Sequence, residues 1–321
     1  MTGPVDLPGL VKFIKGSPQF IGKKEISSVT GGVGPRMSDG GILNGDDAAV
    51  IPDGDGFLLL ATDGILPSLV KAEPFFAGRS AVLANVNDIY SMGGRPLAIV
   101  DVISARESKV ASEIYRGILD FSKRLQVPVV GGHTNLDDGT TFVSLAVLGR
   151  AERIISSFDA RPGQRIALLY NPDGVWLDEH GFWNSLPSRT GSEHIGDLEL
   201  LPGAAEDGLL SAGKDVSMSG IAGTALMMVE ASGVGAEIDL ERVPFPAGIP
   251  VHRWLLAYFA FGFLLAVNEE HWDNLTDMAI SRSLELVHIG SVQEGSELVL
   301  SHGGQRELLW DWAKEPFLGF T

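Results

Sequence analysis

The chain has 321 residues, of which 45% are apolar and 20% charged, a composition typical of globular proteins and too apolar for a disordered chain. Its 41 acidic and 24 basic residues leave a formal net charge of −17, which would repel a nucleic-acid backbone or an anionic membrane surface. The absence of cysteine excludes disulfides, thiolate nucleophiles, thiolate zinc sites and iron–sulfur clusters. Acidic residues that hold magnesium can still recruit a phosphate ligand.

The length predicts two domains of about 150 residues each, because a single hydrophobic core seldom grows larger. Residues 1–13 have no basic segment leading into a long apolar run, and the most apolar stretch, 259–267, is too short to span a bilayer. We therefore expect a cytoplasmic protein.

The first region in chain order is rich in glycine and serine. Residues 16–45 show neither helical nor strand periodicity, and we expect a mobile arm or lid. A short apolar run over 57–62 predicts a buried strand that ends at Asp63. Apolar residues at helical spacing over 79–92 predict a helix that a glycine pair ends.

The rest of the chain alternates between predicted strands and helices. Strands are expected over 97–103, 127–130, 142–148, 165–170, 237–240, 261–267, 284–292 and 297–300, and helices over 111–125, 221–231 and 271–282. A turn at 161–163 leads into the strand from 165, so we expect domains over 1–155 and 156–321. Segment 171–204 shows no period and is expected to be a long irregular connection.

Two short motifs place aspartates at turns. The sequence GDDAAV over 45–50 puts Asp46 and Asp47 on a glycine-initiated turn, followed by small residues that let a large anion approach the backbone. The sequence ATDG over 61–64 puts Asp63 where a strand ends, a frequent position for ligand contacts. Hard cations prefer such oxygen ligands. For each motif taken alone, a structural role as a solvated acidic turn or a loop cap is the more common one.

A more specific motif is NVNDIYSMGGRP over 85–96. Asn85, Asp88 and Ser91 lie three residues apart and form a polar line on the predicted helix. A helix that carries Asn and Asp on one face and ends in a glycine pair and a proline is an uncommon combination. The motif therefore favours a functional site at this helix.

Two weaker motifs follow. The sequence GGHT over 131–134 offers two glycines that can expose backbone N–H groups to a phosphate, and a histidine and a threonine that can ligate or donate. The sequence KDVSMS over 214–219 adds a carboxylate and two hydroxyls near a helix start. A plain turn explains the first motif equally well, and a helix cap the second.

The order of these motifs resembles the PurM-like superfamily, which includes aminoimidazole ribonucleotide synthetase, thiamine-monophosphate kinase, selenophosphate synthetase and the hydrogenase-maturation protein HypE. The resemblance is strong over 40–150 and moderate over 205–295. GDDAAV and the sequence ASGVGAEIDLERVP over 231–244 look like the thiamine-monophosphate kinase. GGHT looks like selenophosphate synthetase.

The resemblance implies an α+β protein with two domains. The N-terminal domain would contain a mixed sheet with helices that pairs across a homodimer into a β-barrel, and the C-terminal domain would be an α/β sandwich. ATP would bind in a groove near that pairing, with Mg²⁺ bridging its phosphates. The implied metal ligands are Asp46, Asp47, Asp63, Asp88 and Asp215, the implied nucleotide-binding residues are Asp47, Asn87, Gly131, Gly132, Thr134 and Ser217, and the implied catalytic residues are His133, Asp63 and Asp88.

Two further sets of residues have weaker support. Lys23, Lys24 and Arg36 on the expected arm could close over the phosphates, with ordinary surface charge as the alternative. Trp176 and Trp183 in the irregular segment could face the substrate, with packing in the core or at a dimer interface as the alternative.

The chain departs from each named relative. HypE modifies its own C-terminal cysteine and selenophosphate synthetase usually carries a cysteine or selenocysteine, and this chain has none. Met218 and Ser219 stand where the thiamine-monophosphate kinase has a second aspartate. His133 stands where that kinase has Asp and the purine enzyme has Glu.

The sequence looks most like the AIR synthase-related proteins. We expect a Mg-ATP-dependent kinase or synthetase that phosphorylates an oxygen of a small metabolite, since phosphoryl transfer needs charge neutralisation and alignment more than covalent help. One alternative is a thiamine-monophosphate kinase, which an assay with that substrate would identify. The other is a non-catalytic ATP-binding or scaffold protein, which would bind nucleotide without turnover.

Overall fold

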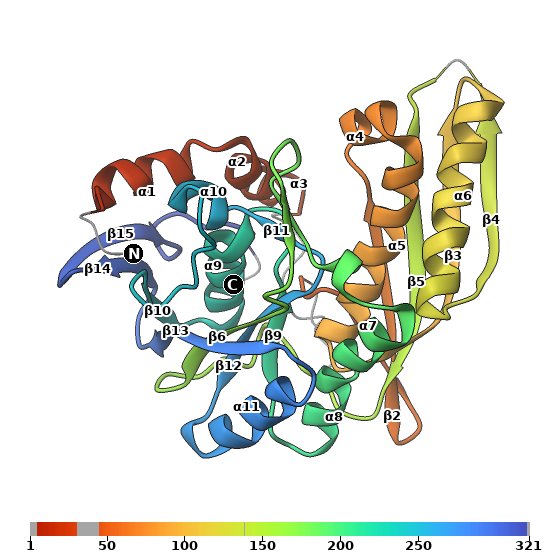
Figure 1. Ribbon diagram of the computed structural model, residues 1–321. Coiled ribbons are helices and arrows are strands. Elements are labelled where there is room, and N and C mark those ends of the chain that lie inside the picture. The colour runs from red at the N-terminus through yellow and green to blue at the C-terminus, as the bar shows by residue number, and fades with distance from the viewer. Residues whose placement is uncertain (1–4, 31–44, 138, 320–321) are drawn as a thin grey trace. The chain divides into compact units, whose positions relative to one another are not determined.

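The computed structural model describes residues 5–30, 45–137 and 139–319. They form two compact units. The five-stranded unit comprises residues 47–154 and 189–203, and the seven-stranded unit comprises residues up to 46, 155–188 and those from 204 onward. Each unit has its own sheet and its own helices (Figure 1).

The five-stranded unit is built on one mixed sheet. Its elements are β1 (Ala49–Asp53), β2 (Gly56–Gly64), α4 (Pro67–Ala72), α5 (Pro74–Ser91), β3 (Arg95–Ala105), α6 (Ser108–Leu125), β4 (Val129–Leu136), β5 (Phe142–Ala151) and α7 (Gly191–Leu198). The strand order is β1-β2-β5-β3-β4. All neighbours are antiparallel except β3 and β4, so β4 is a parallel strand at one edge.

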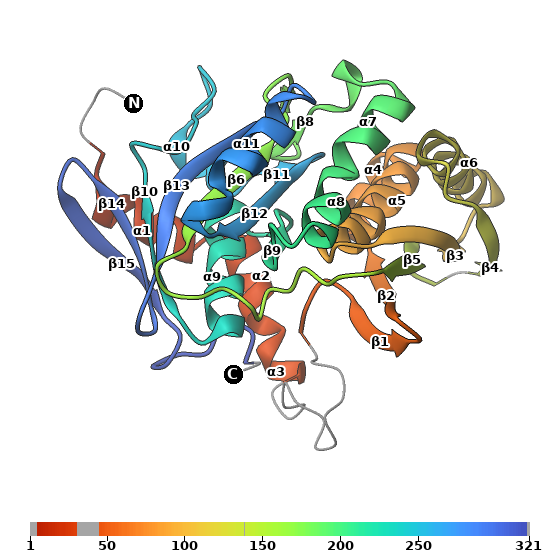
Figure 2. The same cartoon turned by 90° about the horizontal axis from the view of Figure 1, so that it is seen from below.

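The two faces of this sheet differ in exposure. Residues such as Leu59, Ile99 and Val147 are fully buried, and α5 and α6 lie together on this inner face (Figure 2). Strand neighbours point to opposite faces, so Leu60 and Val100 point outward, where they are 46% and 43% exposed. The sheet therefore has one packed face and one exposed apolar face.

The helices α5 and α6 approach closely through two glycines. A Cβ atom at Gly78 would overlap the Ile114 carbonyl oxygen, and a Cβ at Gly117 would overlap the Phe75 carbonyl oxygen. Glycine in a helix interior normally costs stability. At these two positions glycine permits α5 and α6 to cross more closely than a larger residue would allow.

Residues 189–203 join the five-stranded unit through α7. Thr190 and Glu193 form a reciprocal capping box at the helix start, which satisfies its first N–H groups. His194 packs edge-on against Phe121 of α6, with ring centroids 6.3 Å apart, and burial lowers its pKa to about 3. The helix α8 (Leu200–Glu206) follows and crosses the boundary into the other unit.

The seven-stranded unit contains the remaining elements. They are α1 (Leu7–Lys15), α2 (Pro18–Glu25), α3 (Ser27–Thr30), β6 (Arg165–Tyr170), β7 (Val175–Leu177), β8 (Phe182–Asn184), η1 (Leu186–Ser188), β9 (Ala212–Asp215), α9 (Gly220–Ser232), β10 (Gly235–Asp239), α10 (Val251–Trp254), β11 (Tyr258–Phe259), β12 (Gly262–Val267), η2 (Glu269–His271), α11 (Trp272–Ile280), β13 (Glu285–Gln293), β14 (Glu297–His302) and β15 (Gln305–Asp311). The main sheet has the order β15-β14-β10-β13-β6-β12-β9, and β11, β8 and β7 form a small second sheet.

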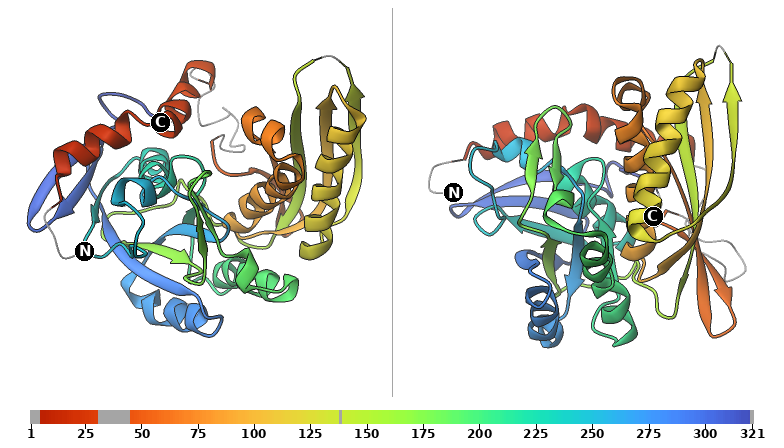
Figure 3. Two further views of the ribbon diagram at one scale, coloured as in Figure 1. Left: turned by 45° about the horizontal axis from the view of Figure 1, so that its top comes forward. Right: turned by 45° about the vertical axis from the view of Figure 1, so that its right-hand side comes forward.

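The centre of the main sheet is covered on both faces. Every residue of β12 is buried, and so is every residue of β6 after the first, as expected for strands between two helical layers. The apolar helix α9 contacts β9, β10, β12 and β14, and α11 contacts β13 from the other side (Figures 1 and 3).

The described residues nearest to each end of the chain pack on this unit. Phe20 of α2 lies among the rings of Trp310 and Phe317, with centroid distances of 5.6 and 4.7 Å. The buried Glu230 carboxylate of α9 accepts hydrogen bonds from the backbone N–H groups of Phe317, Leu318 and Gly319. Figure 3 shows the red N-terminal helices beside the blue C-terminal strands.

Several expectations from the sequence are wrong. The described part of the expected arm over 16–45 contains α2 and α3, because Ser17 caps α2 and Pro18 begins it. Residues 31–44 of that arm lie outside the described residues. The strand predicted to stop at residue 130 continues to 136, because glycines tolerate the extended backbone of an edge strand. Segment 171–204 contains two strands, a 3₁₀ helix and two helices instead of an irregular connection.

The division into units also differs from the expected domains. The sequence places residues 1–155 in one domain, whereas the described residues 5–30 pack with the seven-stranded unit. Residues 189–203 pack with the five-stranded unit. The change of unit at 154–155 falls close to the expected boundary.

The glycine crossing of α5 and α6 can be tested with matched substitutions. We expect Gly117→Ala to lower the free energy of unfolding by about 1–3 kcal/mol, because the new methyl group overlaps a backbone oxygen. Gly196→Ala in α7 meets no atom within 4 Å, so it should raise stability by up to about 1 kcal/mol through helix propensity. Urea unfolding of both variants measures the difference, and equal stabilisation by both would contradict the crossing.

Candidate metal and nucleotide site

Three polar side chains of the five-stranded unit meet where β1 begins and α5 ends. Ser91 Oγ lies 2.7 Å from Asp47 Oδ2 and 2.8 Å from the backbone oxygen of Asp88. One carboxylate oxygen of Asp47 lies within 4.8 Å of one carboxylate oxygen of Asp88. Ser91 is only 1% exposed, so a buried hydroxyl fixes the position of the half-buried Asp47 carboxylate.

This carboxylate pair fits a divalent cation. Oxygen ligands lie about 2.1 Å from Mg²⁺, so two ligands of one ion are at most about 4.2 Å apart. The upper bound of 4.8 Å between the Asp47 and Asp88 oxygens is close to that limit. Two negative charges this close also repel each other, and a cation between them would remove the repulsion.

The three residues of the polar line predicted on α5 do not all take part in this site. Asp88 and Ser91 join Asp47, whereas Asn85 is fully buried. The Asn85 Nδ2 group donates to the Ala81 carbonyl, and its Oδ1 has no hydrogen-bond partner within the described residues. Asn87 is also buried, at 5% exposure.

Asp46 has partners of a different kind. Its oxygens accept hydrogen bonds from Ser156 Oγ at 2.6 Å, Ser157 Oγ at 2.7 Å and the Ser157 backbone N–H. Both partners belong to the seven-stranded unit. The contacts hold Asp46, just before β1, against residues 156 and 157 of the same unit. The two adjacent aspartates of GDDAAV therefore separate, and only Asp47 joins Asp88.

Asp63 lies elsewhere on the sheet. It is exposed at the end of β2 and pairs in register with Leu145, which in turn pairs with Asp101 and then Gly132 across β3 and β4. Since cross-strand partners point to the same face, Asp63, Asp101 and Gly132 form one row on the inner face. Within the described residues, Asp63 is not among the acidic groups that approach Asp47 and Asp88.

The sequence analysis missed Asp101. It is 5% exposed on β3, and a Cβ atom at Gly132 would overlap its carboxylate. Burial raises the pKa of the Asp101 carboxyl. The signal in the sequence is an aspartate inside the otherwise apolar strand predicted over 97–103.

His133 lies on the opposite face of the sheet from that row. It pairs in register with Val102, whose side chain is exposed on the outer face, and its Nε2 lies 3.2 Å from Asn135 Oδ1. Thr134 alternates to the inner face in register with Ile103. GGHT is thus part of a continuous edge strand and not of a loop after a strand.

The KDVSMS segment lies in the seven-stranded unit. Asp215 ends β9 opposite Phe263 and is 6% exposed, and Ser217 is half-buried. Ser219 adopts a left-handed backbone conformation with φ of +81°, which is unusual for a residue other than glycine. Its buried hydroxyl donates to the Gln19 carbonyl at 2.9 Å, so α2 helps to fix this segment.

Two weaker expectations have mixed outcomes. Lys24 pairs with Glu315 of the same unit, and Arg36 lies outside the described residues. Trp183 is 6% exposed, donates its indole N–H to the Asn171 carbonyl and packs against Trp254. Core packing is therefore the correct alternative for Trp183.

Comparison with protein families gives two matches. The model described as AIR synthase related protein, N-terminal domain, matches residues 45–151, and the model described as AIR synthase related protein, C-terminal domain, matches residues 192–303. Together the matches cover more than half of the chain. Within the described ranges, every helix is too short or too polar to cross a bilayer.

Three known proteins are similar in sequence. The chain is 42% identical over 278 residues to "Uncharacterized protein sll0787" of Synechocystis sp., with 86% of each chain covered. It is 32% identical over 279 residues to "Uncharacterized protein MJ0640" of Methanocaldococcus jannaschii, again with 86% of each covered. It is 30% identical over 260 residues to the selenide, water dikinase of Geobacter metallireducens, covering 76% of this chain and 75% of that protein.

Solved structures show a similar fold. T. maritima PurL complexed with FGAR has a TM-score of 0.74 at 17% identity, covering 95% of this chain and 53% of that chain. The present chain thus spans about half the length of PurL. AaThiL complexed with AMPPCP and TMP has a TM-score of 0.62 at 20% identity, covering 83% of this chain and 91% of that chain.

The fit of the carboxylate pair to a cation can be measured directly. We expect Mg²⁺ to raise the melting temperature of the wild type relative to EDTA, because a ligand at about 100 times its Kd adds about 2.7 kcal/mol to the free energy of unfolding. Asp47→Asn and Asp88→Asn should reduce this shift, since each removes one charge and keeps the shape of the side chain. The exposed Asp207→Asn serves as the control, and a shift that all four proteins share would refute the site.

Proposed function

Because the chain belongs to the AIR synthase related family, we propose that it is a Mg-ATP-dependent kinase or synthetase that transfers a phosphoryl group to an oxygen of a small metabolite. The family membership confirms the resemblance drawn from the motifs. The observation that carries the proposal is the Asp47–Asp88 pair, held by Ser91 inside the segment that matches the family's N-terminal domain. A similar relative, the selenide, water dikinase, bears the name of a phosphoryl-transferring enzyme.

In this proposal the residues of the chain position the nucleotide and neutralise its charge. Mg²⁺ bound at the site would neutralise negative charge on the phosphates during transfer. Asp47 and Asp88 would hold such a cation, and Asp215 of the seven-stranded unit is proposed as a further ligand, as the resemblance implies. Ser217 and Asn87 stay proposed contacts to the nucleotide.

The edge strand β4 and the inner-face row supply the other proposed contacts. Gly131 and Gly132 lie on the edge strand β4, where the backbone groups that face away from β3 are open to a phosphate. Thr134 is proposed to donate its hydroxyl on the same face as Gly132. Asp63 keeps its proposed role at the reacting phosphate, and the buried Asp101 beside Gly132 is proposed to orient that strand.

We also propose that two copies pair through the outer face of the five-stranded sheet. Several exposed apolar side chains share that face, which is the kind of apolar patch that marks an interface. Among them are Leu60, Val100, Val102 and Leu148, at 36–46% exposure. His133 lies on the same face, opposite the row of Asp63, Asp101 and Gly132, and its catalytic role stays a proposal from the resemblance alone.

For the phosphoryl acceptor we propose only a chemical class, an oxygen of a small metabolite. AaThiL was solved with AMPPCP and TMP, but at 20% identity that likeness concerns the fold. Met218 and Ser219 replace the second aspartate expected of a thiamine-monophosphate kinase, so we propose a different acceptor. The cytoplasmic location also stays a proposal from the sequence.

Turnover of ATP tests the proposed function. We expect the wild type with Mg²⁺ to transfer or hydrolyse the γ-phosphate in the presence of a metabolite panel that includes thiamine monophosphate. Asp88→Asn and Asp63→Asn should lower the rate by at least about 100-fold, the usual effect of removing one charge-stabilising group. Asp207→Asn should keep the wild-type rate. ATP binding without turnover across the panel would instead identify a non-catalytic nucleotide-binding protein.

Sedimentation tests the proposed pairing. We expect the wild type to sediment as a dimer and the double variant Val100→Glu, Val102→Glu to sediment as a folded monomer, because charges buried at an interface without partners are costly. Val175→Glu changes an exposed apolar residue of the other unit, at 57% exposure, and should stay dimeric. A dimer of the double variant would exclude this face as the interface.

A further inference from the structure

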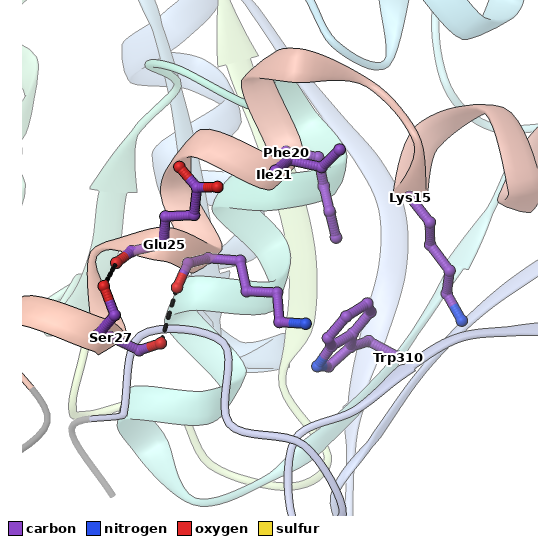
Figure 4. Close-up of a pocket in the computed structure, with 8 residues that line it drawn as sticks. Lys15, Phe20, Ile21, Glu25, Ser27 and Trp310 are labelled. Atoms are coloured by element: carbon purple, nitrogen blue, oxygen red, sulfur yellow. Dashed lines mark hydrogen bonds between the residues drawn. The ribbon is translucent and has the colours of Figure 1, made fainter.

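The seven-stranded unit also has a surface cavity, whose lining contains Lys24 of the expected arm and no residue of the five-stranded unit. It has a volume of about 350 Å³ and lies between α2, α3 and the end of β15 (Figure 4). That volume falls within the usual range for small-molecule sites. Its lining includes Lys15, Phe20, Ile21, Lys24 and Trp310.

The floor of the cavity is a fixed aromatic surface. Trp310 is 7% exposed and packs edge-on against Phe20 and Phe317, with centroid distances of 5.6 and 5.9 Å. Its indole N–H donates to the Glu315 carbonyl at 2.7 Å. Because the polar edge of the indole is already hydrogen-bonded, Trp310 offers a ligand only its ring surface.

Two ammonium groups lie close to that ring. Lys15 Nζ is 5.2 Å from the Trp310 ring centroid and Lys24 Nζ is 5.4 Å from it, both within cation–π range. Lys24 forms an ion pair with Glu315. Within the described part of the chain no carboxylate pairs with Lys15, so one positive charge at the ring is uncompensated.

The two serine hydroxyls of the cavity already donate hydrogen bonds to backbone carbonyls, so their protons are not available to a ligand. The Ser27 hydroxyl donates to the Lys24 carbonyl at 2.7 Å, and the Ser28 hydroxyl donates to the Glu25 carbonyl at 2.6 Å. Figure 4 shows the Glu25 carboxylate directed away from the Trp310 ring, whereas Lys15 reaches toward it. The two ammonium groups of the cavity therefore lie beside the Trp310 ring.

We propose that this cavity binds a small organic anion, whose apolar body lies against Ile21 and the exposed part of the Trp310 ring and whose single carboxylate or phosphate group pairs with Lys15. An ammonium donor and an anionic acceptor form a charge-assisted hydrogen bond. Burial of the ligand body against Ile21, which is 42% exposed, adds the apolar contribution.

Direct binding measurements on the full-length protein test this site. Phenyl phosphate and benzylamine, which share a benzene ring and differ in charge, are titrated by calorimetry in the presence of saturating Mg-ATP. We expect phenyl phosphate to bind and benzylamine not to bind. Lys15→Gln should weaken phenyl phosphate binding about tenfold, as expected for the loss of one hydrogen bond to a charged group.

Two variants complete the design. Lys12→Gln removes a charge from the same last turn of α1 outside the cavity and should bind phenyl phosphate as the wild type does. Ile21→Trp fills the cavity from its rim, where Ile21 is 42% exposed, and should abolish binding while the protein stays folded by circular dichroism. Equal binding by Lys15→Gln and the wild type, or preference for benzylamine, would overturn the proposal. Failure of the ATP assay leaves this result unaffected, because the cavity is independent of Asp47 and Asp88.

Discussion

The proposed chemistry depends on the repulsion between two carboxylates that the fold holds close together. Asp47 and Asp88 come from different elements, and the buried Ser91 hydroxyl joins the first to the end of the helix that carries the second. Like charges at this separation cost free energy unless a cation lies between them. Such a half-buried pair favours the binding of a divalent ion. In the proposed function, that ion would in turn bind a polyphosphate.

The packing around α5 makes that arrangement rigid. The crossing of α5 and α6 through Gly78 and Gly117 brings the two backbones into direct contact, and α5 also packs on β2, β3 and β5. At the C-terminal end of α5, Tyr90 donates to Glu199 at 3.3 Å and Arg95 pairs with the same carboxylate at 2.8 Å. Burial and the Glu199 carboxylate together raise the pKa of Tyr90, so its hydroxyl stays a donor.

The sequence predicted the elements whose apolar pattern is strong. The strand expected over 165–170 matches β6, because a strand buried on both faces reads as one continuous apolar run. The helices α1 and α2 were missed because their signals are caps: Asp6 and Ser17 accept hydrogen bonds from the first turns, each followed by a proline in that turn. Periodicity over such short helices carries little information.

The sequence predicted which types of residue form the site better than it predicted how they are arranged. The sequence pointed to Asp47 and Asp88, and no spacing rule shows that the neighbouring Asp46 binds serines 110 and 111 residues away. Asp101 escaped notice because a single aspartate in an apolar strand has no motif around it. The glycines of GGHT predicted a strand end, whereas the edge position of β4, which depends on strand order, allows them to remain extended.

A crystal of the protein grown with Mn²⁺ and a non-hydrolysable ATP analogue would test the central claim most directly, through the anomalous scattering of manganese. The account predicts an anomalous peak in contact with one oxygen of Asp47 and one of Asp88, with the phosphates of the analogue completing its coordination. Density for the nucleotide with manganese bound elsewhere, and neither carboxylate in its coordination sphere, would contradict it.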